Sequence, residues 1–167
     1  MLLGVKNYTL KLAGLTLIEL LVVMVILSIL ASVAMPFSEL IVKRNKELEL
    51  KRNLRTIRTA IDRFHQDWQL KKLSQFESTA SIDGYPLTLL TLTEQITLTG
   101  EGAKSRRYLR RIPPNPFADQ TLPANEQWLR LSYLDNADTS SWGGQDVYDV
   151  RTESERTAID GSTYNVW

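Results

Sequence analysis

The hydrophobic pattern of the chain begins with one long apolar run near its amino-terminus. Residues 20–38 carry no charged side chain, and the run from Leu15 to Met35 is interrupted by a single charge, Glu19. As a helix this run is about 32 Å long at 1.5 Å per residue, close to the roughly 30 Å of a bilayer core. The pattern therefore predicts one membrane-spanning helix.

Beyond Pro36 the pattern becomes amphipathic. Apolar residues recur at helical spacings on one face, and they are Leu50, Leu54, Ile57, Ile61, Phe64 and Trp68. Such a stripe predicts a helix with one face covered by a globular domain. Because neither Gly nor Pro occurs between Pro36 and Gly84, one helix of about 55 to 60 residues is predicted; the alternative is two helices hinged near Pro36.

The carboxy-terminal part has the composition of strands and turns. "QWLRLSYL" and "DVYDVRT" are rich in β-formers and read as strands, while "DNADTSSWGGQ" between them reads as a turn-rich loop. The expected fold class is α+β, with a long amino-terminal helix packed against a small antiparallel β-sheet.

Composition narrows the function without defining it. The 167 residues carry a net charge of +1, so the sequence lacks the basic excess that is typical of proteins that bind nucleic acids. The chain contains no cysteine, which excludes thiol catalysis and cysteine metal sites. The one histidine, His65, lies beside the apolar stripe, where a structural role is the usual one. No nucleophile motif is present, so we do not expect an enzyme.

The amino-terminus allows three interpretations. It fits a secretory signal, with Lys6 and Lys11 as the basic region and cleavage after Ala34, or an uncleaved signal anchor. Both leave Glu19 unexplained, since a lone carboxylate at membrane depth costs about 2 to 3 kcal/mol or more. Cleavage between Gly14 and Leu15 is the third, because it creates an α-amine that pairs with that carboxylate.

These residues resemble the class III signal of type IV prepilins and type II secretion pseudopilins. Gly14 precedes the cut, Glu19 stands at mature position five and Pro36 at position twenty-two, although Leu15 replaces the usual phenylalanine. The resemblance implies that a prepilin peptidase removes residues 1–14 and methylates Leu15. It also implies that Glu19 pairs with the amino-terminus of a neighbouring subunit during assembly.

The resemblance extends downstream to the major pseudopilin of type II secretion. It is carried by "KRNLRTIRTAIDRFHQDW", "GYPLTLLTL", "RRYLRRIPPNPF" and "AIDGSTYNVW". It implies a type IV pilin-like fold with a leader at 1–14, a transmembrane and assembly helix at 15–36, and a periplasmic domain at 37–167 whose amphipathic helical half covers about 37–73.

The function that this resemblance implies is structural. The chain is expected to form a homopolymeric periplasmic pseudopilus that helps export folded proteins across the outer membrane. Its expected partners are other pseudopilins, an inner-membrane assembly platform and the prepilin peptidase. Alternatives are a type IV pilin or minor pseudopilin, although the carboxy-terminal cysteine pair common in major pilins is absent, and a secreted or anchored periplasmic binding domain.

Membrane orientation depends on which signal is followed. Two basic residues precede the span and five follow it closely, namely Lys43, Arg44, Lys46, Lys51 and Arg52. The positive-inside rule alone would place the main domain in the cytoplasm. Processing of a prepilin requires a cytoplasmic leader, so we expect a single-pass inner-membrane protein with its carboxy-terminal domain in the periplasm.

A calcium site in the carboxy-terminal loop is a further expectation from the family. Glu153, Glu155 and Asp160 place three carboxylates within eight residues, and hard oxygen ligands on a flexible loop suit Ca²⁺. Arg156 offers the alternative, in which ion pairs satisfy these acids without a metal.

Overall fold

A computed structural model describes residues 14–73, 79–99, 105–136 and 138–167, without the side chains of residues 33–36. The chain divides into two compact units, Met1–Ile41 and Val42–Trp167, which are treated separately below.

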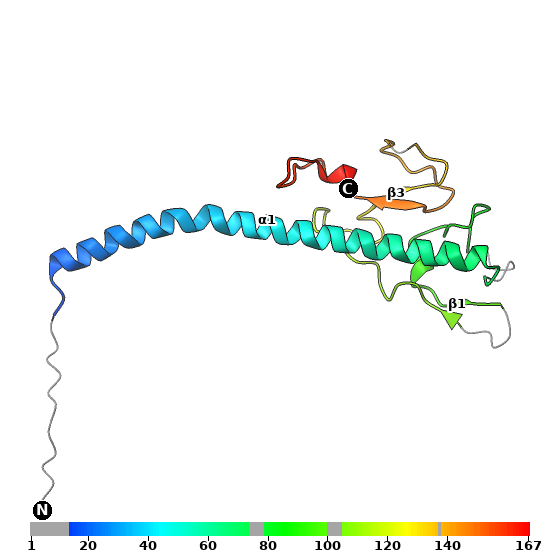
Figure 1. The fold of residues 1–167 in the computed structure, drawn as a ribbon, viewed down its shortest axis with the longest axis horizontal. Coiled ribbons are helices and arrows are strands. Elements are labelled where there is room, and N and C mark those ends of the chain that lie inside the picture. The colour runs from blue at the N-terminus through cyan, green and yellow to red at the C-terminus, as the bar shows by residue number, and fades with distance from the viewer. Residues whose placement is uncertain (1–13, 74–78, 100–104, 137) are drawn as a thin grey trace, which may run out of the picture. The chain divides into compact units, whose positions relative to one another are not determined.

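One helix dominates the chain. α1 spans Leu17–Gln69, a run of 53 residues, and Pro36 lies inside it, so a single helix is observed where two hinged helices were the alternative (Figure 1). The helix ends in a Schellman arrangement: Lys71 has φ of 53°, and the amide of Lys72 donates to the Asp67 carbonyl at 2.9 Å.

The predicted apolar stripe is the part of α1 that builds the core of the second unit. Its first five residues are buried, with Leu50, Ile57 and Phe64 fully inaccessible. Trp68 differs, because 37% of it is exposed. Its ring lies against Gly84, where φ is +83° and an added Cβ would be 2.3 Å from the indole.

The strands form two small antiparallel sheets. The elements after α1 are η1 (Leu90–Thr93), β1 (Ile96–Thr97), β2 (Ser105–Arg106), β3 (Leu129–Leu131), β4 (Asp149–Arg151) and η2 (Tyr164–Val166). β3 pairs with β4 in the register Leu129↔Arg151, which confirms the two predicted strands and the loop that joins them. The β1–β2 pair was not predicted, since strands of two residues are too short to show alternation. The observed architecture is α+β, with α1 and small antiparallel sheets, consistent with a type IV pilin-like fold.

Both sheets belong to one core against α1. The buried cluster joins the stripe of α1 to Ile96 of β1, Val150 of β4, Trp128 and Tyr164. In Figure 1 β1 and β3 are drawn on opposite sides of the second half of α1. The helix is therefore the central element of this unit, and the sheets and loops fold onto it.

Candidate processing and assembly site

The predicted cleavage point lies just before α1. Residues 1–13 of the expected leader lie outside the described residues, whereas Gly14 and Leu15 are described, and both are exposed. Apart from its chain neighbours, no described residue has an atom within 4 Å of the position that a Cβ on Gly14 would occupy, and α1 begins at Leu17. The bond between Gly14 and Leu15 is therefore on open, non-helical backbone, as a protease requires.

Glu19 lies in a capping arrangement at the start of α1. The Glu19 amide donates to Thr16 Oγ1 at 3.3 Å, and the Thr16 amide approaches Glu19 Oε2 at 3.5 Å. The Leu20 amide donates to the Thr16 carbonyl at 3.1 Å, so Thr16 is the N-cap and Glu19 is at position N3. This reciprocal pair is a capping box, and it satisfies backbone donors that lipid would leave unpaired.

The capping role of Glu19 was not predicted from the sequence, although a local signature for it is present. The pattern Thr-x-x-Glu before an apolar run is its signature, and Thr16, Leu17, Ile18 and Glu19 display it. Cleavage before Leu15 leaves both capping residues in the mature chain.

Among the described residues of its own unit, none covers the apolar half of α1. Every described side chain from Leu15 to Ser32 is exposed, including Leu20 at 53% and Leu30 at 62%. The helix contains a segment of mean hydropathy 2.8, long and apolar enough to cross a membrane. The side chain of Pro36, the other predicted assembly residue, lies outside the described part of the structure.

The structure does not gather the three carboxylates predicted for calcium. Glu153, Glu155 and Asp160 are all exposed, and the Asp160 Oδ1 atom accepts hydrogen bonds from the Ser162 amide (3.0 Å) and hydroxyl (2.6 Å). Within the described ranges, no three or more His, Asp or Glu side chains lie close enough together to hold a metal ion. Calcium binding stays a prediction.

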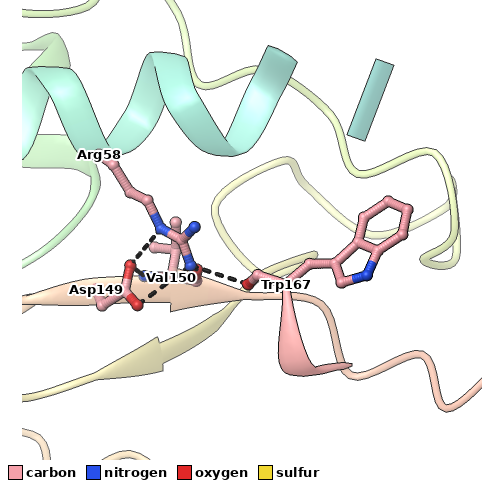
Figure 2. Close-up of polar contacts among 4 residues, drawn as sticks. All are labelled: Arg58, Asp149, Val150 and Trp167. Carbon is pink, nitrogen blue, oxygen red and sulfur yellow. Dashed lines mark hydrogen bonds and ion pairs between the residues drawn. The ribbon is translucent and has the colours of Figure 1, made fainter. Parts of the chain in front are cut away.

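Instead, side chains of α1 hold the carboxy-terminal tail, residues 152–167. Figure 2 shows Arg58 donating through Nε to Asp149 Oδ1 at 2.7 Å and through Nη2 to the carbonyls of Val150 (3.2 Å) and Trp167 (2.9 Å). The Lys51 ammonium lies 4.0 Å from the centroid of the Trp167 ring. One guanidinium thus connects the helix, β4 and the tail.

Glu47 makes a further contact between α1 and the tail. Its Oε1 accepts the Ile159 amide at 2.8 Å and the Tyr164 hydroxyl at 2.7 Å, and only 9% of the residue is exposed. Burial, reinforced by the hydrogen bond to Glu47, raises the pKa of Tyr164 to about 12. This pair could not be predicted from local sequence patterns, because 117 positions separate Glu47 from Tyr164.

His65 has the structural role that its position predicted. Its ring stacks on Tyr85 with centroids 4.3 Å apart and an interplanar angle of 4°, and its Nδ1 lies 3.2 Å from the Gly84 carbonyl. Both ring nitrogens have partners, since Gln69 Nε2 is 2.8 Å from Nε2. His65 therefore joins α1 to the turn at Gly84.

Comparison with protein families supports the amino-terminal assignment. Residues 11–35 match the prokaryotic N-terminal methylation motif. Comparison with curated proteins and with solved structures gives no match. The motif marks structural proteins of the type IV pilin-like class, which are not enzymes. Residues 11–35 thus carry a type IV pilin-like prepilin signal.

Proposed function

We propose that the chain is a pseudopilin of type II secretion, a structural subunit of a periplasmic pseudopilus that helps export folded proteins. Residues 1–14 are the leader, residues 15–36 lie in the inner membrane before assembly, and residues 37–167 form the periplasmic domain. The prepilin peptidase cuts before Leu15 and methylates its amine.

The observation that carries this proposal is the exposed apolar half of α1, which begins two residues after the cleavage point. Soluble monomers rarely expose an apolar surface that is continuous over four helical turns. Exposed side chains cover all faces of this half, because successive residues such as Val22 (48% exposed), Val23 (49%) and Met24 (60%) point about 100° apart around the helix axis. Lipid covers them in the lone subunit, and the helices of other subunits cover them in the fibre.

Glu19 supports the step from a membrane anchor to an assembling subunit. After cleavage the Leu15 amine lies four residues from Glu19, about 6 Å along the helix axis. A sound hydrogen bond between them within one first turn is awkward, whereas a subunit displaced along the fibre axis presents its own Leu15 amine squarely. The pair then sets the axial register of neighbours while it removes an uncompensated charge from the apolar layer.

The fibre is an open assembly of identical contacts. Heterologous contacts that do not close into a ring produce helical filaments, and a protruding apolar helix repeats such a contact in every subunit. The preference for a type II secretion pseudopilus over a type IV pilus rests on the downstream resemblance, above all on "RRYLRRIPPNPF". Its partners are other pseudopilins and an inner-membrane assembly platform.

Amino-terminal sequencing and intact mass of the chain, made with and without a prepilin peptidase, test the first step. The expected product begins at N-methylated Leu15 only when the peptidase is present. A bulky residue in Gly14→Phe should block this cut, while Gly14→Ala should only slow it. A mature chain that begins at Met35 would support a released periplasmic domain instead.

A secretion assay tests the second step. In a host with a type II machine, loss of this chain should leave the exported proteins in the periplasm, and the wild-type chain should restore their release. If the chain is processed correctly but cells that lack it secrete normally, the chain belongs to another pilin-like assembly.

A further inference from the structure

Aromatic rings from three segments of the second unit meet in one cluster. His65 belongs to α1, Tyr85 to the connection between α1 and η1, and Tyr133 and Tyr148 to the connection between β3 and β4. His65 and Tyr85 stack with an interplanar angle of 4°, and Tyr133 stacks on Tyr85 at a centroid distance of 5.4 Å and an angle of 23°. Tyr148 meets Tyr85 and Tyr133 edge-on, at centroid distances of 5.1 and 5.5 Å. Tyr85, Tyr133 and Tyr148 are called the tyrosine surface below.

The tyrosine surface is held by its own contacts and yet is open to solvent. Tyr133 is 51% exposed and Tyr148 is 47% exposed. The Tyr133 amide donates to Asp146 Oδ1 at 2.9 Å, which fixes the backbone beside the ring. Aromatic rings with a hydrated hydroxyl group offer a large contact area and are enriched where proteins bind partners. The surface therefore has the properties of a binding site as well as of a packed cluster.

Acidic groups surround the tyrosine surface. Burial raises the pKa of Tyr85, and four neighbouring acidic groups raise it further, namely Tyr148, Tyr133, Asp146 and Asp62. Among the described residues, no cation opposes this shift. Asp62 is exposed, and neither Arg55 nor Arg58, which line a depression with it, lies within ion-pair distance of its carboxylate. The local charge therefore favours a cationic ligand.

Cations already cover other aromatic rings of this unit. The Arg130 guanidinium lies 4.0 Å from the centroid of the Trp142 ring, and the Lys51 ammonium lies 4.0 Å from that of Trp167. Within the described part of the chain, no lysine or arginine lies over a ring of the tyrosine surface. Its half-exposed, electron-rich rings thus lack the cation that they attract.

We propose that the tyrosine surface binds an arginine side chain on an extended segment of a partner protein other than this chain. A guanidinium is planar and stacks on aromatic faces, so it extends the near-parallel rings of Tyr85 and Tyr133, while its charge complements Asp62. A polypeptide, unlike a small cation, also covers the apolar side chains that are close to these tyrosines in the sequence, since Leu134 is 72% and Ile82 91% exposed.

The choice of a partner outside the fibre rests on the proposed function, whereas arginine binding itself does not. The subunits of the proposed fibre are joined through α1, and this joint does not use the tyrosine surface. One weak site in every subunit gives a fibre many sites, so a partner with several such segments binds the fibre more tightly than it binds one subunit.

Binding of end-blocked tripeptides to the full-length chain in an uncharged detergent tests the site. The probe is Leu-Arg-Leu, and in the control peptide citrulline replaces the arginine, which keeps the shape and removes the charge. With isotope-labelled tyrosines, NMR should show shifts of the Tyr133 and Tyr148 ring signals. The arginine peptide should bind roughly tenfold more tightly than its control, and equal binding of the two would overturn the proposal. Methylguanidinium that binds as tightly as the arginine peptide would assign the site to a small cation and likewise overturn it.

Substitutions separate the ring from the hydroxyl and the charge. Tyr133→Ala should abolish measurable binding, whereas Tyr133→Phe keeps the ring and should retain the affinity within about twofold. Asp62→Asn should weaken binding about threefold. Glu49→Gln is the matched control, since Glu49 is an exposed acid of α1 that is not among the groups acting on Tyr85. Thermal unfolding verifies that each variant is folded, and Tyr148→Ala provides the same test if Tyr133→Ala is not. Wild-type affinity in a folded variant that lacks the ring would overturn the proposal.

The yield of sheared fibres distinguishes a partner outside the fibre from a second copy of the chain. Tyr133→Ala should leave this yield unchanged. Loss of fibres from the folded and processed variant would assign the tyrosine surface to a contact between copies and overturn the proposal. A wild-type chain that forms no fibres but binds the arginine peptide would count against the proposed function and leave the arginine site intact.

Discussion

Removing the Glu47 carboxylate should destabilise the domain, because it is a buried acceptor through which α1 holds the carboxy-terminal tail. Glu47→Ala leaves the Ile159 amide and the Tyr164 hydroxyl without their acceptor, and Tyr164 is only 1% exposed. A hydrogen bond to a charged group contributes about 1.5 to 3 kcal/mol. The two bonds share one oxygen, and water partly replaces that oxygen in the variant, so their contributions are not fully additive. The expected loss in the free energy of unfolding is therefore about 3 kcal/mol.

The assay is thermal unfolding of the full-length chain in detergent, followed by circular dichroism. A loss of about 3 kcal/mol corresponds to a decrease in Tm of roughly 10 °C for a domain of this size. Glu47→Gln keeps a carbonyl acceptor and should cost only about 1 kcal/mol. This variant is the matched control for the loss of charge without the loss of an acceptor.

A double-mutant cycle isolates the bond itself. Tyr164→Phe removes the hydroxyl but keeps the ring, which stacks on Phe117 with centroids 4.1 Å apart. Glu47→Ala and Tyr164→Phe should be non-additive by about 1 to 2 kcal/mol. A cost for Glu47→Ala below about 0.5 kcal/mol, which is usual at exposed sites, would refute the role of this contact.

Three further predictions concern the turn at Gly84, alkaline pH and calcium. Gly84→Ala should destabilise the domain by about 2 kcal/mol, because φ of +83° strains an L-residue and the new Cβ displaces the Trp68 ring; unchanged thermal unfolding would contradict this. The raised pKa of Tyr164 means that the folded chain keeps a proton that the unfolded chain loses from pH 10.0 upward. Stability should therefore be fully present below pH 10.0 and fall as the pH rises through about 12, and Tyr164→Phe should flatten this fall in an alkaline titration followed by circular dichroism. If Glu153, Glu155 and Asp160 bind calcium, millimolar Ca²⁺ should raise Tm relative to a chelator, and an equal Tm in both would retire the site.

The sequence predicted those parts of the fold that depend on local periodicity. The spacing from Leu50 to Phe64 placed the buried stripe correctly, and β-formers marked the segments that contain β3 and β4. Trp68 continues the spacing but is partly exposed, because its ring lies against the turn at Gly84 instead of in the core.

Long-range polar contacts were beyond prediction from the sequence. Arg58 and Asp149 are 91 positions apart, and nothing in either segment identifies the other as its partner. Glu47 resembles any other acidic residue of a solvated helix until the tail folds back onto it. The capping box at Thr16 was different, since its signature is local and readable.

The central claim is that Glu19 acts in assembly between subunits, and comparison of two variants tests it most directly. Glu19→Ala removes both the capping contact and the carboxylate, whereas Thr16→Ala removes the reciprocal cap but keeps the carboxylate. The measurement is the yield of sheared fibres from cells in which cleavage before Leu15 has been verified. The account predicts that Glu19→Ala chains are inserted and cleaved but form no fibres, while Thr16→Ala chains still assemble. Fibres from Glu19→Ala at the wild-type level would contradict it.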